Sequence, residues 1–292
     1  MRVLTLFLLL GAGLLEAATF VVKGPNAGRN WTDIDPSGPD RFLWWLQIDS
    51  HDSTLYAITQ RDLGDEWHLL VSEDGGQTWQ IRQSFPREVY RISAVAAPGA
   101  PDTLYLAYEV YGYPRTTVMI AQVTNHGASM EIYRAEGLVV IKGGNSYGVL
   151  ATVSADPRAP AKLYALVTKD PGNDEIFALF HALWVSLDGG RNWERLDPPL
   201  DSGCTYPEVQ IDSSDSSLYL VCGNELLKST DGGASWTPKP FPGGERLWDL
   251  QTGPGNPVFL YGSRSSSRRS TTRLFLPLGV RSDPRPRFFG LE

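Results

Sequence analysis

The octapeptide SEDGGQTW at residues 72–79 recurs in this chain as SLDGGRNW at 186–193 and as STDGGASW at 229–236. Every copy has a serine, an aspartate, two adjacent glycines and a tryptophan at matching positions. The glycines supply the positive φ angles of a compact hairpin turn, and the aspartate accepts backbone N–H bonds across it. The tryptophan then covers the hairpin with apolar surface. These roles are architectural, so the octapeptide predicts a repeated fold rather than a chemical site.

A second repeated element accompanies the octapeptide. It occurs in STLYAIT, DTLYLAY, AKLYALV, SSLYLVC and PVFLYGS, and each copy follows a polar or proline-containing turn. Successive leucines of these elements, at positions 55, 104, 163, 218 and 260, are 42 to 59 residues apart. This spacing suits the four-stranded blades of a propeller, which take about 40 to 50 residues each.

The pattern Ser-x-Asp-Gly-Gly-x-Thr-Trp resembles the Asp-box, or BNR repeat, of sialidases, sortilin-type receptors, some endoglucanases and photosystem assembly factors. The resemblance implies that the motif closes a hairpin between the outer strands of a β-propeller blade. It also implies that the motif lies away from the ligand face and does not itself catalyse. The structural Asp-box residues are then Ser72, Asp74, Gly75, Gly76, Trp79, Ser186, Asp188, Gly189, Gly190, Trp193, Ser229, Asp231, Gly232, Gly233 and Trp236.

Two weaker copies extend the repeat. Residues 123–133, VTNHGASMEIY, have lost one glycine and carry Met130 in place of tryptophan, and residues 24–34, GPNAGRNWTDI, match only the back half. The last Leu-Tyr element has no octapeptide behind it, so the N-terminal strand is expected to complete the final blade and remove the exposed edges. The sequence therefore predicts an all-β fold, a single β-propeller of four-stranded antiparallel sheets, closed by pairing of its N- and C-terminal strands. Five blades are expected, and six if a long insertion hides one.

The chain divides into three predicted segments. Residues 1–18 resemble a cleavable secretory signal peptide, because a short basic start is followed by an apolar run and small residues. Residues 19–280 form the predicted propeller, and residues 281–292 form a basic tail. No second apolar stretch approaches the length of a membrane span. We therefore expect a secreted or periplasmic protein that is monomeric and has no transmembrane segment after signal removal.

The net charge and the cysteine content limit which partners, crosslinks and metal sites the sequence predicts. The formal net charge of −7 leaves no basic footprint for nucleic acid. Cys204 and Cys222 flank an alternating stretch with a central turn, so a disulfide between them is predicted for an exported chain, with two buried thiols as the alternative. Two cysteines and four scattered histidines predict no metal site, and no cofactor is expected. Asp-rich turns such as DSSD at 212–215 leave calcium binding open.

The innermost strand of each blade is predicted in FLWWLQI, VYRISAV, SYGVLATV, TYPEVQI and RLWDLQT, each of which precedes a Leu-Tyr element. Every one of them has an aromatic residue at a matching position. Because such strands begin near one mouth of the central channel, these rings predict a collar suited to stacking on sugars or gripping apolar and peptide side chains. Packing between blades is the alternative role. The collar comprises Trp44, Tyr90, Tyr147, Tyr206 and Trp248, with Arg41, Arg91, Asn145, Glu208 and Arg246 as polar companions.

The expected function is a non-catalytic binding or assembly scaffold that docks a polypeptide or a glycan over this mouth. A sialidase-like glycoside hydrolase is the alternative. VYRIS, from residue 89, resembles the Tyr/Phe-Arg-Ile-Pro segment of sialidases, which implies that Arg91 clamps a substrate carboxylate. Ser93 in place of proline departs from that family, as does the position of the segment after an Asp-box. The other catalytic candidates in that interpretation are Tyr206, Glu208, Arg246 and Asp249.

Overall fold

The structure of this chain is a computed structural model. It describes residues 2–6, 20–24, 32–33, 42–49, 52, 54–61, 65–97, 99–110, 115–138, 140–143, 146–169, 182–200, 207–222, 225–239, 247–252, 259–265 and 271–277. Within these ranges every regular element is a β-strand, and the strands of each sheet pair antiparallel. The described residues hold no helix with the length and apolarity that a membrane span requires.

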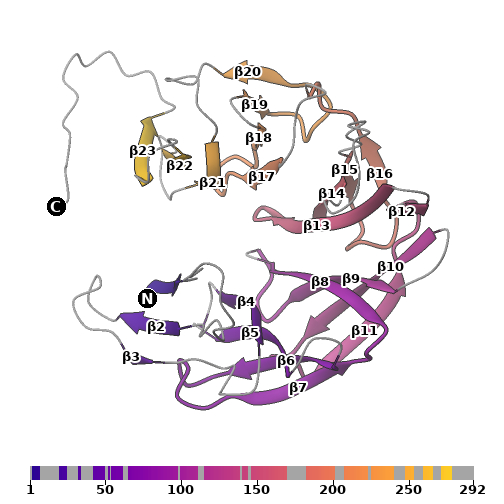
Figure 1. The fold of residues 1–292 in the computed structure, drawn as a ribbon, viewed down its shortest axis with the longest axis vertical. Coiled ribbons are helices and arrows are strands. Elements are labelled where there is room, and N and C mark those ends of the chain that lie inside the picture. Colours follow the sequence, from indigo (N-terminus) through magenta and orange to yellow (C-terminus); the bar gives the residue numbers. More distant parts are fainter. Residues whose placement is uncertain are drawn as a thin grey trace.

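Four four-stranded blades follow one another along the chain and form most of the arc in Figure 1. The first blade contains β4 (Phe42–Ile48), β5 (Leu55–Gln60), β6 (Trp67–Ser72) and β7 (Gln80–Phe85). The second contains β8 (Val89–Ala96), β9 (Leu104–Val110), β10 (Arg115–Thr124) and β11 (Ser129–Arg134). The third contains β13 (Ser146–Asp156), β14 (Ala159–Lys169), β15 (Ala182–Ser186) and β16 (Glu194–Leu196). The fourth contains β17 (Glu208–Ile211), β18 (Leu218–Cys222), β19 (Glu225–Ser229) and β20 (Thr237–Lys239).

A short linking strand, β12 (Val140–Gly143), pairs with both β10 and β13. It thereby joins the second and third blades into one nine-stranded sheet. The prediction of an all-β propeller built from four-stranded antiparallel sheets is confirmed.

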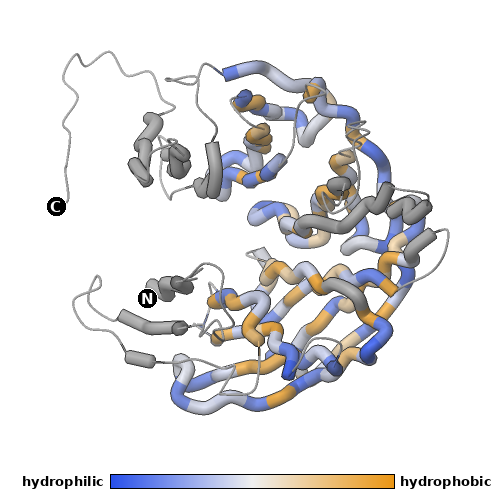
Figure 2. The backbone as a smooth tube through the Cα atoms, viewed as in Figure 1, coloured by the Kyte–Doolittle hydropathy of each residue, from blue (hydrophilic) through white to orange (hydrophobic). Residues whose placement is uncertain are grey.

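In the four complete blades the Leu-Tyr elements are the second strands, and their described residues are buried. All six residues of β5 and all five of β18 are buried, whereas the outer strand β7 is largely exposed. Alternate residues of β9 and of β14 pack against the blade on either side, which explains why these sequences are apolar without strict alternation. Figure 2 shows the same gradient, with hydrophobic residues in the inner and middle strands and hydrophilic residues at the outer turns.

The blades are joined by apolar clusters and by hydrogen bonds between their innermost strands. Tyr56 and Leu106 belong to one cluster between the first and second blades. The Gln47 side-chain oxygen on β4 accepts the Ala96 N–H at 3.0 Å, and Ser93 Oγ on β8 accepts the Val153 N–H at 2.9 Å. Ser93, the residue that departs from the sialidase pattern, therefore links the second blade to the third.

The two ends of the chain form separate three-stranded sheets. One contains β21 (Leu247–Thr252), β22 (Phe259–Ser265) and β23 (Thr271–Pro277), and the other contains β1 (Arg2–Leu6), β2 (Phe20–Gly24) and β3 (Thr32–Asp33). Among the described strands no ladder joins these sheets, so the predicted pairing of N- and C-terminal strands is not found there. β2 has partners on both edges, β3 on one and β1 on the other. The pairing of the chain's ends therefore stays a prediction. The number of blades beyond the four complete ones stays a prediction.

The ends of the chain carry three predictions that stay predictions. β1 lies inside the predicted signal peptide, and the predicted tail at 281–292 lies outside the described residues. No free cysteine is found among the described residues, which include the buried Cys222 at the end of β18. Cys204 lies outside them, so the Cys204–Cys222 disulfide also stays a prediction.

Candidate ligand-binding face

The fold has two opposite faces. Adjacent strands run in opposite directions, so the first strand of each blade begins on the face at which its third strand also begins. We name this the collar face, because the predicted collar residues that the structure describes lie near the starts of β4, β8, β13 and β21. The octapeptides follow the third strands β6, β15 and β19 and therefore lie on the other face, the box face. The three octapeptide turns thus belong to three different blades and not to one cleft.

The octapeptide at 186–193 shows how each turn is held. Ser186 Oγ is buried, donates to Asp188 Oδ1 at 2.8 Å and accepts the Gly190 N–H at 2.8 Å. Asp188 Oδ1 also accepts the Asn192 N–H at 2.9 Å. The Trp193 indole N–H donates to the Gly190 carbonyl at 2.8 Å and so closes over the turn. In the three octapeptides the paired glycines have φ between 73° and 98°, a region in which a side chain is strained.

The hydrogen bonds around the box aspartates lower their pKa values. Partial burial raises the pKa of Asp188, but the N–H and side-chain bonds from Asn192 outweigh it and hold the pKa at about 2. The bonds from Ser235 hold the pKa of Asp231 at about 2 as well. A carboxylate whose folded-state pKa is depressed stabilises the fold above its ordinary pKa of 3.8. That contribution is lost as the pH falls through the folded-state value.

This linkage gives a prediction for acid solution. Asp188→Asn should lower the melting temperature at pH 7, because the neutral amide accepts the turn's N–H bonds less strongly. The difference between wild type and variant should shrink as the pH falls from about 4 to about 2. Thermal unfolding followed by circular dichroism over this range measures it. A difference that stays constant down to pH 2 contradicts the role given to the ionised carboxylate.

The predicted innermost strands lie where the sequence placed them. Trp44 is on β4, Tyr90 on β8, Tyr147 on β13 and Trp248 on β21, each within three residues of the strand's start. Contacts between β4 and β8, β8 and β13, β13 and β17, and β17 and β21 make these strands successive neighbours around the centre. Glu208 begins β17, and Asp249 lies on β21. The remaining predicted site residues, Tyr206, Arg41, Asn145 and Arg246, lie outside the described residues.

Two collar positions coincide with irregularities in strand pairing. On β4 the register passes from Leu43 to Trp45, so Trp44 is the extra residue of a β-bulge. On β8 it passes from Val89 to Arg91, which makes Tyr90 the extra residue. β21 has a register shift that starts directly after Trp248. Bulges re-aim side chains and are frequent beside functional sites, and at this face they recur on three innermost strands.

The Trp44 side chain is held at the surface by a buried tryptophan. Its ring is 48% exposed and lies 5.3 Å from the ring of Trp67, which is only 4% exposed. The Trp67 indole N–H donates to the Val89 carbonyl at 3.0 Å, which ties it to the second blade. Trp67 therefore packs between the blades, and Trp44 rests on it with half of its surface open. Phe42, 43% exposed, lies two residues away on the same strand.

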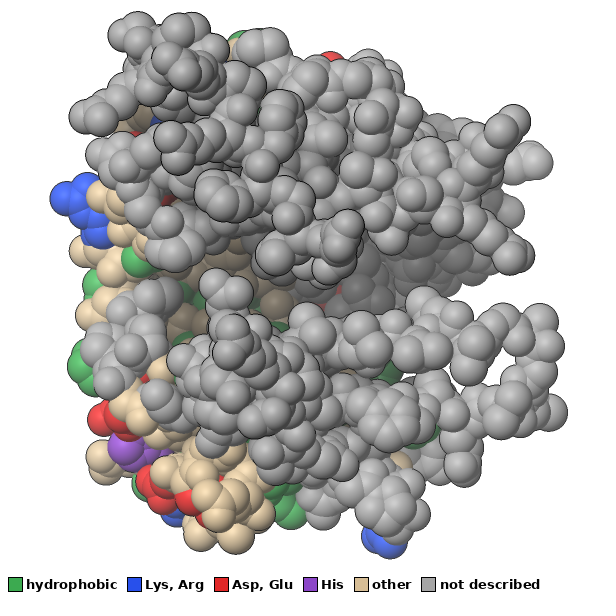
Figure 3. Space-filling view, turned by 90° about the vertical axis from the view of Figure 1, so that its left-hand side faces the viewer, with side chains coloured by type: hydrophobic (Ala, Val, Ile, Leu, Met, Phe, Trp, Pro, Cys, Tyr) green, Lys and Arg blue, Asp and Glu red, His purple; other side chains and the backbone are tan. Residues whose placement is uncertain are grey.

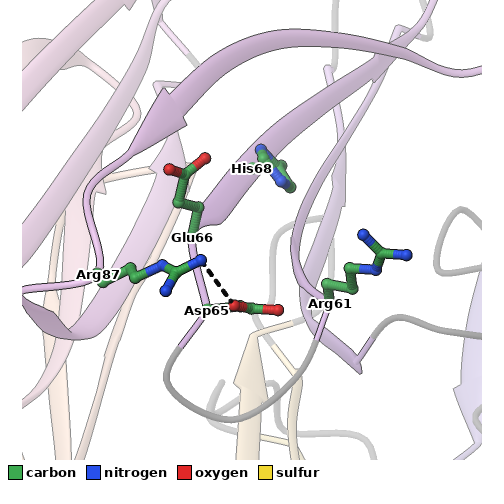
Figure 4. Close-up of a pocket in the computed structure, with 5 residues that line it drawn as sticks. All are labelled: Arg61, Asp65, Glu66, His68 and Arg87. Atoms are coloured by element: carbon green, nitrogen blue, oxygen red, sulfur yellow. Dashed lines mark ion pairs between the residues drawn. The ribbon is translucent and has the colours of Figure 1, made fainter.

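A charged pocket lies on the same face of the first blade, and the sequence analysis missed it. Its volume is about 170 Å³, and Figure 4 shows the side chains that line it. They come from the β5–β6 turn, β6 and the β7–β8 link: Arg61, Asp65, Glu66, His68 and Arg87. Arg87 pairs with Asp65 at 3.3 Å, and His68 Nδ1 is 3.0 Å from Ser84 Oγ. The signal in the sequence is the dense charge of RDLGDEWH at 61–68, between two apolar strands.

The position of Arg91 bears on the hydrolase alternative. In the β8–β9 ladder Arg91 is the direct partner of Glu109, whose side chain is fully buried. The position proposed for a carboxylate clamp is thus opposite a buried glutamate in the backbone ladder.

Comparison with known proteins gives the fold and no family. No protein-family model matches the sequence, and no curated protein matches it. The structure is similar to an α-L-arabinofuranosidase from Fusarium graminearum in complex with an iminosugar inhibitor, at 14% identity and a TM-score of 0.55 over 89% of this chain and 85% of that chain. It is similar to an ulvan lyase of a polysaccharide lyase family, at 13% identity and a TM-score of 0.58 over 89% and 70%.

A third similar structure is YCF48 bound to D1 peptide, at 14% identity and a TM-score of 0.51 over 84% of this chain and 70% of that chain. All three are β-propeller proteins. At these identities the likeness extends to the fold alone. This chain is a β-propeller.

Proposed function

We propose that this protein is an exported, non-catalytic binding or assembly scaffold whose collar face docks a polypeptide or a glycan. We also propose that its repeat belongs with the Asp-box repeats. The observation that carries the proposal is Trp44, a half-exposed ring at a bulge on an innermost strand, supported from below by Trp67. An aromatic ring on a rigid support loses little conformational entropy on binding, so it is suited to stacking on a sugar or holding an apolar side chain.

Two further observations support this choice. The face beside Trp44 carries both charge signs, because Arg61 and Arg87 line one pocket with Asp65 and Glu66. Figure 3 shows hydrophobic, acidic and basic side chains interspersed over the described part of one side of the molecule. A mixed surface of this kind matches the rim of a protein or glycan interface better than a nucleic-acid site. Two propellers of similar fold have ligands of these kinds: YCF48 is bound to D1 peptide, and the arabinofuranosidase is in complex with an iminosugar inhibitor.

The test removes the collar rings. Trp44→Ala with Trp248→Ala should weaken partner capture at least about tenfold, because stacked rings are frequent binding hot spots. The melting temperature should change little, since half of the Trp44 ring already faces solvent. Capture by the immobilised protein from the native envelope, with mass spectrometry and a glycan array in parallel, measures the loss. Leu187→Ala, an exposed substitution on the box face, is the matched control. A large fall in melting temperature would assign the rings to the core instead.

The second candidate is a glycoside hydrolase. It is favoured by fold similarity to an arabinofuranosidase. Turnover of a fluorogenic sialoside that is lost in Arg91→Ala would support the hydrolase and overturn the scaffold. We expect no turnover by either protein.

A further inference from the structure

The weak octapeptide copy in the second blade carries a histidine where the intact copies carry a glycine. Val123 pairs with Leu104 as Ser72 pairs with Leu55 and Ser186 with Leu163, so the registers correspond. His126, three residues later, therefore occupies the position of the first box glycine. It keeps the left-handed conformation of that glycine, with φ of 51°. A non-glycine residue in this conformation is uncommon and is strained.

Three carboxylates from three other segments surround the His126 imidazole. Its Nε2 atom is 2.7 Å from Asp52 Oδ2 and 2.6 Å from Asp102 Oδ1, and its Nδ1 atom is 3.3 Å from Glu73 Oε1. Asp52 lies in the β4–β5 turn, Glu73 in the first octapeptide and Asp102 in the β8–β9 turn. The cluster thus spans the junction of the first and second blades on the box face. One ligand atom from each of His126, Asp52 and Asp102 falls within 4.8 Å of the other two.

A buried tyrosine hydroxyl at the same junction has no hydrogen-bond partner. At the next two junctions the tyrosine of the Leu-Tyr element reaches the first box glycine of the following blade. Tyr164 Oη donates to the Gly232 carbonyl at 3.4 Å, and Tyr105 Oη lies 3.4 Å from where a Cβ on Gly189 would stand. Tyr56 is the equivalent residue below His126. It is 0% exposed, and its hydroxyl is unpaired.

The equivalence of Tyr56 with Tyr105 and Tyr164 places this unpaired hydroxyl beneath the turn that carries His126. Burial raises the pKa of Tyr56, and the negative charges of Asp49, Asp102, Asp52 and Glu73 raise it further. A buried hydroxyl without a partner destabilises the fold, so a native chain that retains one is expected to use it. The strained backbone of His126 and the unpaired Tyr56 hydroxyl are two separate free-energy costs. Both lie at the junction of the first and second blades.

We propose that His126, Asp52 and Asp102 bind a divalent transition metal ion of the Zn²⁺ type, and that this ion clasps the first blade to the second. An imidazole with two carboxylates is a ligand set for Zn²⁺, whereas Ca²⁺ takes oxygen ligands. The metal would take the place of a proton on Nε2, between the imidazole and the two aspartates. Glu73 accepts from Nδ1–H and orients the ring, a common partner for a metal-bound histidine. The Tyr56 hydroxyl donates to a water or carboxylate on the metal.

The sequence did not reveal this site because its ligands are far apart in the chain. Residues 52, 102 and 126 belong to three turns, and only the packing of adjacent blades brings them together. The site lies on the face opposite the collar, so it is independent of the proposed function. Loss of metal binding and loss of partner capture are therefore separate outcomes.

The experiment uses the full chain without a histidine tag. Isothermal titration with ZnCl₂ at neutral pH, and elemental analysis after dialysis, should give one Zn²⁺ per chain and a raised melting temperature. His126→Gly restores the box glycine. It should abolish zinc binding and leave the zinc-free melting temperature equal to or above that of the wild type. His68→Ala, a histidine of the collar-face pocket, is the matched control and should bind zinc as the wild type does.

Two more variants test the supporting residues. Asp102→Asn should weaken zinc binding at least about tenfold. Tyr56→Phe should weaken it less while leaving the zinc-free fold as stable or more stable, because an unpaired buried hydroxyl is removed. A wild-type chain that retains no zinc, or a His126→Gly chain that still binds one equivalent, overturns the proposal.

Discussion

Trp193→Ala is expected to lower the free energy of unfolding by about 3–5 kcal/mol, the usual range when a buried aromatic side chain is truncated. Trp193 is only 6% exposed and belongs to the apolar cluster between the second and third blades. Its indole N–H also holds the Gly190 carbonyl. The substitution therefore opens a cavity and leaves that carbonyl without its donor. Urea unfolding followed by tryptophan fluorescence or circular dichroism measures the change.

Trp236→Ala is the matched control. Trp236 makes the equivalent bond to the Gly233 carbonyl at 3.0 Å, but its ring is only partly buried. If burial between blades determines the cost, the loss in Trp236→Ala should be clearly smaller than in Trp193→Ala. Equal losses would mean that the hydrogen bond, and not the inter-blade packing, dominates.

Gly137→Ala is expected to destabilise the fold by at least about 2 kcal/mol, because an L-residue is strained in the left-handed region. Gly137 has φ of 87°, and a Cβ at this position would overlap the Trp193 carbonyl oxygen. Backbone bonds fix this contact on both sides, since Glu136 N–H donates to Arg191 O and Trp193 N–H donates to Glu136 O, each at 2.8 Å. The chain has no room to relax, so we expect the melting temperature to fall by several degrees in differential scanning calorimetry.

Gly189→Ala is the control that separates the cost of backbone strain from the cost of steric overlap. Gly189 has φ of 73°, but a Cβ there would meet the Tyr105 and Tyr133 side chains at ordinary contact distances of 3.4 to 3.7 Å. Its cost should be that of the backbone conformation alone and therefore less than that of Gly137→Ala. A larger loss in Gly189→Ala would contradict the account of the Gly137 contact.

The fold was predictable because short sequence patterns with a clear local structural role recur along the chain. Paired glycines fix a tight turn wherever they occur, and an apolar Leu-Tyr strand is buried in every blade for the same reason. The innermost strands followed from their place before those elements. The pairing of the chain's ends stays a prediction, because no ladder between described strands joins the two end sheets.

The candidate sites were predictable only in part. Trp44 was found because a ring recurs at the start of each innermost strand, but the bulge that exposes it leaves no clear mark in the sequence. The pocket lined by Arg61 and Arg87 combines charged side chains from the β5–β6 turn and the β7–β8 link, which are separate in the sequence. The environment of His126 depends on a neighbouring blade, and no spacing along the chain encodes that distance.

The predicted cleavage of the signal peptide would remove the strand β1. It occupies one edge of β2, and all of it lies within the leader predicted to be cleaved after residue 18. Processing at that point would strip away this strand and leave unpaired backbone groups on β2. An exposed strand edge of this kind readily pairs with another strand. In the uncleaved chain this edge of β2 is paired with β1, and in a chain cleaved after residue 18 it would be available to another strand.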